Sequence, residues 1–175
     1  MHLSSGGCIF VLHCVVKSGK MDIEKHKFLT KELPQLIKAL PADAVGKWGK
    51  MNGQQMIEHV AAFFDVSSGL IMFDLVTPAE QLHRFRDFLF SEKQFKENTR
   101  APLNVIGEEP LPLKFSGITQ ANENLERSII SFENYFKNNP LKKTLHPVFG
   151  ELNFEEWVLL HYKHVTHHLR QFGVM

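Results

Sequence analysis

The chain has 175 residues, of which 43% are hydrophobic and 22% are charged, values typical of one globular domain with a sizeable core. Lys17 and Lys20 are the only charged residues among the first twenty, so residues 21–175 carry 18 basic and 19 acidic groups, a formal charge of −1. This near-neutral body has no run of Lys or Arg, which argues against nucleic acid or an anionic membrane as partner. Both cysteines, Cys8 and Cys14, precede it, which excludes a disulfide framework and suits the reducing cytoplasm.

The first twenty residues differ in pattern from the rest of the chain. Residues 8–16 form an apolar run of nine residues, well short of the roughly 20 that a membrane-spanning helix needs. A secretory signal carries positive charge ahead of its apolar run, whereas Lys17 and Lys20 follow it here. We therefore expect residues 1–20 to be an extension outside the fold, and residues 21–175 to be a single domain.

Two helical segments are predicted in the next thirty-odd residues. Apolar residues recur at helical spacing over residues 23–40, as one helix or as two pieces, with Pro34 expected to open the second. Asn52 followed by Gln55 forms a capping box, which predicts that another helix begins near Gly53.

A histidine occupies the apolar face of that second segment. On a helical wheel, Phe63, Val66 and Leu70 lie within about 40° of His59. This pattern predicts that the helix extends through Leu70 with His59 at the centre of its buried stripe.

The middle of the chain predicts a short helix and then a long loop. Residues 77–80 combine a capping box, from Thr77 to Glu80, with Pro78 at the first helical position, so a helix should continue to about Leu89. Periodicity then lapses over residues 91–117, where proline and glycine are frequent. Loops of this length are often functional, so this one either covers a site or is a plain surface connection.

Two long helices complete the predicted fold. Residues 125–136 place apolar side chains at spacings of four, three and four, and this helix should end near Asn138. Asn153 and Glu156 form another capping box, so the last helix should run to about Phe172. No alternating strand pattern is found. We therefore predict an all-α fold, a four-helix bundle with one additional short helix and a long loop.

The last predicted helix is rich in histidine, with four in eight residues: His161, His164, His167 and His168. Residues four apart are neighbours on a helix, so His164 and His168 share the inward stripe and are able to bind one cation. His167 points about 100° away from His168 and is expected to be packed or exposed. His59 is the best candidate in the chain for a third ligand.

Three neutral imidazoles suit Zn, Ni, Fe or Cu better than Mg or Ca, which prefer oxygen ligands. A site with three protein ligands leaves a position for substrate, which favours chemistry over a structural role. The alternative is that these histidines are hydrogen-bonded core residues. Their spacing alone does not decide between the two interpretations.

Four stretches of the chain also carry a resemblance to a known family. They are His59, the lead-in Trp48-x2-Met51-Asn52, the turn His146-Pro147-x-Phe149-Gly150, and His164-x2-His167-His168-x2-Gln171. Together, over residues 22–173, they resemble the DinB-like superfamily of metal-binding four-helix bundles. The resemblance implies a divalent metal held by His59, His164 and His168.

The resemblance also implies what such a metal could do. DinB-like proteins include S-transferases and isomerases that use low-molecular-weight thiols, and several of them are homodimers. We therefore expect a metal-dependent enzyme that transfers a low-molecular-weight thiol, or acts on a thiol adduct of a small-molecule substrate. A metal-dependent hydrolase and a non-catalytic metal- or small-molecule-binding protein of a stress response are the alternatives. Despite the family's name, no contact with DNA is implied.

Three further residues are candidates for supporting roles. Gln171 lies on the histidine stripe, where it could hydrogen-bond a ligand imidazole and so contribute to cofactor binding. His161 also faces inward and is a candidate catalytic acid or base, although core packing is the simpler interpretation. Glu58 lies about 100° from His59 around the helix and is expected to be solvated or to support a ligand.

Overall fold

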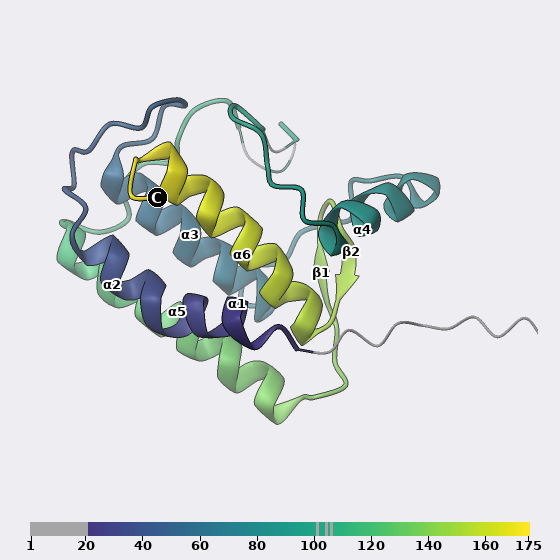
Figure 1. Cartoon of the computed structure of the whole chain (residues 1–175). Helices are drawn as coiled ribbons and strands as arrows, with labels where there is room; N and C mark the ends of the chain where they lie inside the picture. Colours follow the sequence, from purple (N-terminus) through teal and green to yellow (C-terminus); the bar gives the residue numbers. More distant parts are fainter. Residues whose placement is uncertain (1–20, 101, 104, 106) are drawn as a thin grey trace, which may run out of the picture.

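The computed structural model describes residues 21–100, 102, 103, 105 and 107–175 (Figure 1). The predicted extension, residues 1–20, lies outside the described residues. Helices dominate, as expected, and a small antiparallel sheet accompanies them. In chain order the elements are α1 (Ile23–Lys27), η1 (Phe28–Glu32), α2 (Leu33–Lys38), α3 (Gly53–Ser67), η2 (Ala79–Gln81), α4 (Leu82–Phe90), α5 (Ile118–Asn138), β1 (Thr144–His146), β2 (Gly150–Leu152) and α6 (Phe154–Gln171).

The first three elements form one continuous helical run. Between α1 and α2 the chain makes a π-helical turn, η1, in which the Leu33 N–H donates to the Phe28 carbonyl, five residues back. Pro34 follows directly in the first turn of α2. Because proline has no N–H and its ring crowds the preceding turn, a wider turn at this point lets the chain remain helical.

Both of the capping boxes that flank the histidine-bearing helices are confirmed. The Asn52 side chain accepts from the Gln55 N–H at 2.8 Å, and the Gln55 side chain accepts from the Asn52 N–H at 3.0 Å. Asn153 and Glu156 make the same reciprocal pair at 2.9 and 3.0 Å. These contacts satisfy N–H groups that a helix start leaves without partners, and they begin α3 and α6 where the sequence predicts.

The capping box predicted at Thr77 is wrong. Pro78 has extended backbone angles (φ −54°, ψ 141°) and caps a 3₁₀ turn, η2, with no side-chain hydrogen bond. The α-helix α4 begins only at Leu82. Thr77 is nevertheless buried, because the preceding segment runs beside the hairpin turn, where the Val76 N–H donates to the Pro147 carbonyl at 2.8 Å.

The expectation that the chain contains no strand is also wrong. Strands β1 and β2 form an antiparallel hairpin around the turn that begins at His146. His146 Nδ1 accepts from the N–H groups of Val148 and Phe149 at 3.0 and 3.1 Å, and Gly150 closes the turn at φ +77°. Each strand has only three residues, too few for an alternating pattern to be visible in the sequence.

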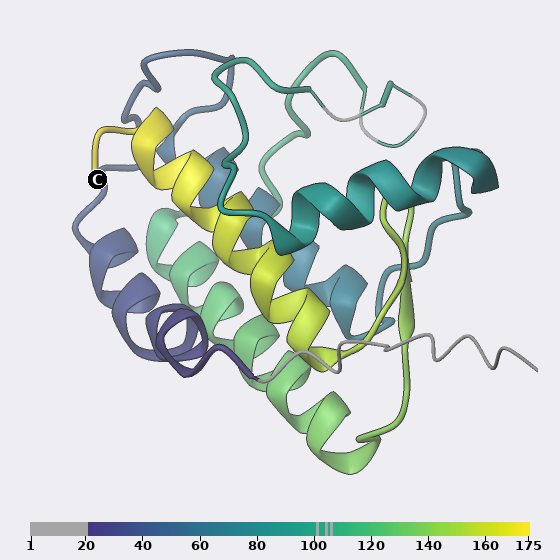
Figure 2. The ribbon, with the colours of Figure 1, turned by 45° about the vertical axis from the view of Figure 1, so that its right-hand side comes forward.

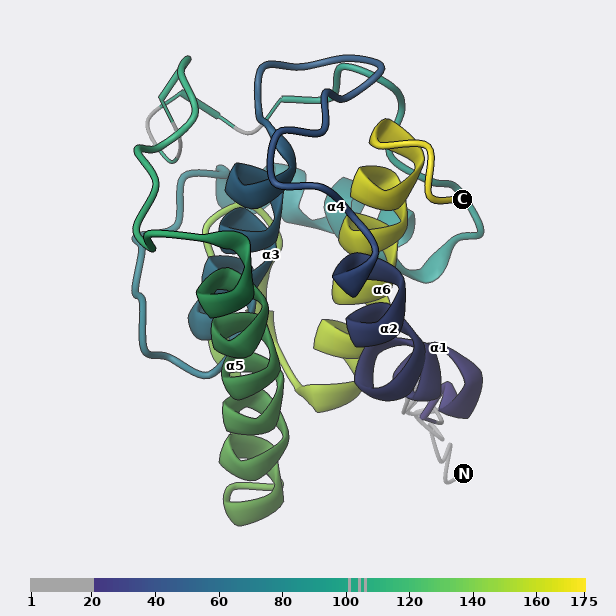
Figure 3. The same cartoon turned by 90° about the vertical axis from the view of Figure 1, so that its left-hand side faces the viewer.

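The long helices share one core (Figures 2 and 3). In Figure 3, α3 and α5 run in one direction, and the run from α1 to α2 and α6 run in the opposite direction. Helix α3 packs against α5 and α6, while α1 contacts α6 and α2 contacts α5. Many of the fully buried large side chains come from η1, α2, α3, α5 and α6: Leu29, Leu33, Ile37, Ile57, Phe64, Leu125, Phe132, Trp157 and Leu160. Burial of each stabilises the fold by about 1.5–3 kcal/mol.

The buried face of α3 differs from the predicted one. It is centred on the buried side chains of Ile57, Val60 and Phe64, and Phe64 contacts Phe132 of α5. His59 is only half-buried and faces His164 of α6. The helix ends at Ser67, so Leu70 lies outside it and is 68% exposed. A single apolar stripe on a helical wheel implies one packing neighbour, but α3 has two, α5 and α6. His59 faces α6.

The expected long connection is confirmed in the described part of residues 91–117, where no helix or strand forms. This connection passes over the end of the molecule where α3 begins and α6 ends (Figures 2 and 3). None of the described helices combines the length and the apolar content that crossing a membrane requires.

Candidate metal site

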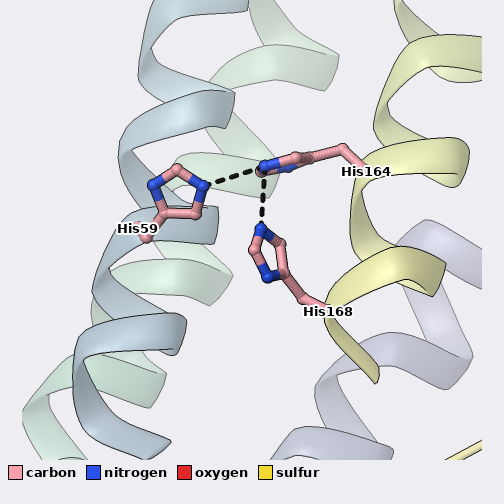
Figure 4. A group of neighbouring side chains, drawn as sticks. All are labelled: His59, His164 and His168. Atoms are coloured by element: carbon pink, nitrogen blue, oxygen red, sulfur yellow. Dashed lines mark hydrogen bonds between the residues drawn. The ribbon is translucent and has the colours of Figure 1, made fainter. Parts of the chain in front are cut away.

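Three predicted ligands from two helices converge in the structure. His59 projects from α3, and His164 and His168 project from α6, one turn apart (Figure 4). His164 Nε2 lies 2.9 Å from His59 Nε2 and 3.1 Å from His168 Nε2. One nitrogen from each ring lies within 4.8 Å of the other two. Among the described residues, this is the one group of three or more potential ligands close enough to hold a metal ion.

Gln171 fixes the orientation of one of these rings. Its amide nitrogen donates to the Trp48 carbonyl at 2.6 Å, so its oxygen must face His168 Nδ1, 2.8 Å away. His168 therefore carries its proton on Nδ1 and donates it to Gln171. The lone pair on His168 Nε2 is left facing the centre of the three-histidine group, as second-shell hydrogen bonds arrange for metal-binding histidines.

The two short contacts inside the group cannot both be full hydrogen bonds. Because His168 Nε2 has no proton, it can only accept from His164 Nε2. If His164 Nε2 donates to His168, it has no lone pair left for His59. If it accepts from His59, two lone pairs face each other across 3.1 Å. One cation between the three rings would accept a lone pair from each of them.

The distances suit such a cation. Bonds of about 2.0–2.1 Å from a zinc ion to two imidazole nitrogens place these nitrogens about 2.8–3.4 Å apart for bond angles between about 90° and 110°. The two short contacts in the group are 2.9 and 3.1 Å. An all-imidazole donor set favours Zn, Ni, Fe or Cu over oxygen-preferring ions.

Burial keeps the three rings in the form that binds metals. It lowers the pKa of His59 to about 4, and a further contribution comes from nearby His167. The pKa values of His164 and His168 are well below the usual 6.5, first because of burial and then because the rings disfavour one another's positive charge. All three imidazoles are therefore neutral at pH 7, with lone pairs available.

Phe63 covers one side of the group, a role that its place in the sequence did not indicate. Its ring lies 4.1 Å from the His164 ring at an interplanar angle of 32°. His59 and His164 are both half-buried, whereas His168 is buried. His59 and His164 thus keep part of their residue surface exposed, and an apolar ring borders the group.

His161, the candidate acid or base, belongs to the core instead. It is fully buried, its ring stacks on Phe64 at 3.8 Å, and its Nε2 donates to Ser67 Oγ at 2.9 Å. The donor assignment follows because Ser67 gives its own proton to the Phe64 carbonyl at 2.7 Å. The structure does not bring His161 into the three-histidine group.

His167 is packed rather than exposed, and it stays outside the group as expected. Its ring lies 5.7 Å from Trp48 and 6.1 Å from Phe95.

Glu58 has a role that its position in the sequence did not indicate. Its carboxylate accepts from the backbone N–H groups of Lys114 and Phe115 at 2.7 and 3.3 Å. It thus ties the end of the long connection to the helical turn that carries His59.

The contact that holds Gln171 in place could not be predicted from the sequence. Gly49 has φ +78°, and a β-carbon at this position would lie 2.5 Å from Gln171 Nε2. The backbone around Trp48 therefore approaches Gln171 so closely that only glycine fits. A glycine beside Trp48 is visible in the sequence, but its partner 122 residues away is not.

The chain was also compared with known proteins. Residues 25–175 match the family described as "Protein of unknown function (DUF1569)". The chain belongs to this family. Comparison with curated proteins and with solved structures found no match. The matched region includes the three histidines and the residues that contact them, Phe63 and Gln171. The family's description assigns no activity.

Proposed function

We propose that this DUF1569 chain is a metal-dependent enzyme of the DinB-like type, with the α1–α2 run, α3, α5 and α6 as a four-helix bundle. Its metal ligands are His59, His164 and His168, and its reaction transfers a low-molecular-weight thiol or acts on a thiol adduct. The homodimer that the resemblance implies, and the cytoplasmic location that the placement of the cysteines suits, belong to the same proposal.

One observation carries the metal assignment. The three Nε2 atoms meet at two short distances that cannot both be full hydrogen bonds, because Gln171 holds the proton of His168 on Nδ1. A cation resolves this arrangement, and neutral imidazoles are ready to bind one. Structural sites usually have four protein ligands, so three histidines favour a site with room for substrate.

A borderline divalent ion with neutral ligands keeps its positive charge and lowers the pKa of a thiol that coordinates it. The thiol must come from a cosubstrate, because residues 21–175 contain no cysteine. The chain's own residues orient and shield the site. Gln171 fixes the His168 ring, Phe63 packs on His164, and Glu58 ties down the connection beside His59.

The hydrolase alternative needs a base to steer a water molecule, and the inward candidate was His161. Its Nε2 is engaged with Ser67, and its ring is stacked within the core. This arrangement favours thiol transfer over hydrolysis. A non-catalytic binder would keep the metal without turnover, so it is separated from both enzymes by an activity assay.

The metal assignment is tested by metal analysis of purified protein. We expect about one transition ion per chain in the wild type, and loss of most of it in His59→Ala and in His164→Ala/His168→Ala. His83→Ala is the matched control, because His83 is exposed on α4. A metal-free wild type, or unchanged content in the ligand variants, would refute the metal site.

The reaction is tested with metal-loaded protein, a panel of low-molecular-weight thiols and a generic electrophile, by following thiol loss. We expect turnover by the wild type and by His83→Ala, and loss of turnover in His168→Ala. Equal rates in the wild type and His168→Ala would rule out metal-dependent thiol transfer for that panel. Metal binding without any turnover would favour the non-catalytic binder.

A further inference from the structure

A cleft of about 480 Å³ lies near the end of α6 and has no part in the proposed reaction. It is formed where the connection 39–52, the start of the connection 91–117 and the end of α6 meet. The charged and aromatic residues that line it are Lys47, Trp48, Phe95, Lys96, Glu97 and Arg170. No member of the three-histidine group lines this cleft in the part of the chain that the structure describes.

The cleft concentrates positive charge. Three cationic side chains, Lys47, Lys96 and Arg170, face one acidic side chain, Glu97, in a protein whose overall formal charge is only +1. This surplus raises the local concentration of small anions. Lys47 and Lys96 are exposed, so both ammonium groups are free to turn toward a ligand.

Arg170 supplies a more rigid anchor than the lysines. Its Nε donates to the Thr166 carbonyl at 3.3 Å, and its Nη2 donates to the Phe95 carbonyl at 3.2 Å. These contacts use two of the five N–H donors of a guanidinium group and fix its plane. A planar, oriented guanidinium is suited to a two-point contact with a carboxylate or phosphate.

Aromatic rings form the apolar part of the wall. Trp48 and Phe95 both line the cleft, and His167 packs against both of them from behind. Trp48 Nε1 and His167 Nδ1 are buried without a hydrogen-bond partner among the described residues. Both atoms are shielded from solvent, so what the wall offers to a ligand is its ring faces for stacking.

We propose that this cleft binds a small organic anion in which a carboxylate or phosphate is attached to a planar ring. The anionic group contacts Arg170 and the two lysines, and the ring packs on Trp48 and Phe95. This inference does not rest on the proposed metal chemistry, although the two sites are neighbours. The Trp48 carbonyl that holds Gln171 belongs to the residue whose side chain lines the cleft.

Trp48 provides a direct readout. The chain has two tryptophans, and Trp157 is fully buried in the core, so a ligand in the cleft should change the fluorescence of Trp48. The probes are adenosine monophosphate and benzoate, which carry a ring with a phosphate or a carboxylate. Adenosine supplies a ring alone, and inorganic phosphate supplies an anion alone.

We expect saturable quenching by at least one ring-bearing anion, with at least tenfold weaker binding of adenosine and of inorganic phosphate. The preferred probe identifies the anionic group. The signal should disappear in Trp48→Phe, and added salt should weaken binding because the charges are exposed. If neither ring-bearing anion quenches saturably, or if inorganic phosphate binds as tightly as both, the proposal is wrong.

Substitutions that remove positive or negative charge from the cleft should change the affinity for the anion in opposite directions. Lys47→Gln/Lys96→Gln should weaken binding about tenfold, whereas Glu97→Gln should tighten it severalfold. Lys142→Gln/Lys143→Gln is the matched control, because these lysines are exposed and lie outside the cleft. Equal effects of the two double variants would overturn the proposal. His59→Ala should bind the anion normally even if it has lost a metal, so failure of the metal proposal would remain distinguishable.

Discussion

Gln171 and Trp48 are 123 residues apart in the chain, yet one hydrogen bond between them decides how a histidine is protonated. The Gln171 amide nitrogen donates to the Trp48 carbonyl, which turns the amide oxygen toward His168 Nδ1. Without this contact the amide could rotate by half a turn and present its nitrogen to the ring. The loop around Trp48 therefore sets the direction of a lone pair in the three-histidine group.

Replacement of Gln171 by Leu should weaken metal binding about 10- to 100-fold, because His168 loses the acceptor that holds its ring and its tautomer. Affinity is measured by competition with a coloured chelator, and helix content is measured by circular dichroism. Gln35→Leu, at an exposed position of α2, is the control. Equal metal affinities for the two variants would show that Gln171 does not support the site.

Gly49→Ala should also lower metal affinity, because the added β-carbon would collide with Gln171 Nε2. The substitution also strains a backbone at φ +78°, which costs about 1 kcal/mol. Gly69→Ala is the matched control, because Gly69 has φ +73° and open space around it. Both variants should lose stability in urea, but only Gly49→Ala should lose metal affinity. The same metal loss in both would mean that general destabilisation is the cause.

Ser67→Ala should reduce the free energy of unfolding by about 1–3 kcal/mol, because it leaves the buried His161 N–H without its acceptor. Metal content should stay the same, since His161 lies outside the three-histidine group. The comparison is Ser68→Ala, because the Ser68 hydroxyl bonds only to carbonyls of its own helix and should matter less. A loss of metal in Ser67→Ala would connect His161 to the site after all.

Protonation of His146 should make the protein less stable in acid. Burial lowers the pKa of this ring to about 3, and its Nδ1 accepts two backbone N–H groups in the hairpin turn. In the unfolded chain the ring has its usual pKa of about 6.5, so below that pH the unfolded state binds a proton that the folded state rejects. The contribution of the neutral His146 ring to the free energy of unfolding is fully present above pH 6.5. At pH 5 it has fallen by about 2 kcal/mol.

His146→Asn isolates this contribution, because an amide oxygen can accept from the turn but does not titrate. The drop in urea-measured stability between pH 7 and pH 5 should be about 2 kcal/mol smaller in this variant than in the wild type. His83→Asn, at an exposed position, should retain the full drop. If His146→Asn and the wild type lose equal stability, His146 is not the titrating group.

Much of the helical framework is determined by sequence-local interactions. Asn52 with Gln55, and Asn153 with Glu156, begin helices because each pair is only three residues apart and makes its contacts before any tertiary structure is needed. The pairing of His164 with His168 is equally local, since one helical turn brings them together. These features were therefore predictable from the order of residues alone.

Other features depended on packing between distant segments. Thr77 had the pattern of a helix cap but is buried in a segment that runs beside the hairpin, so the helix begins later with a different turn. The convergence of His59 on His164 joins residues 105 apart, and only the packing of α3 against α6 makes it. An isolated helix specifies which side chains share a face, but not which neighbour that face meets. The tertiary structure therefore decided that the ring nitrogens of three neutral imidazoles lie side by side.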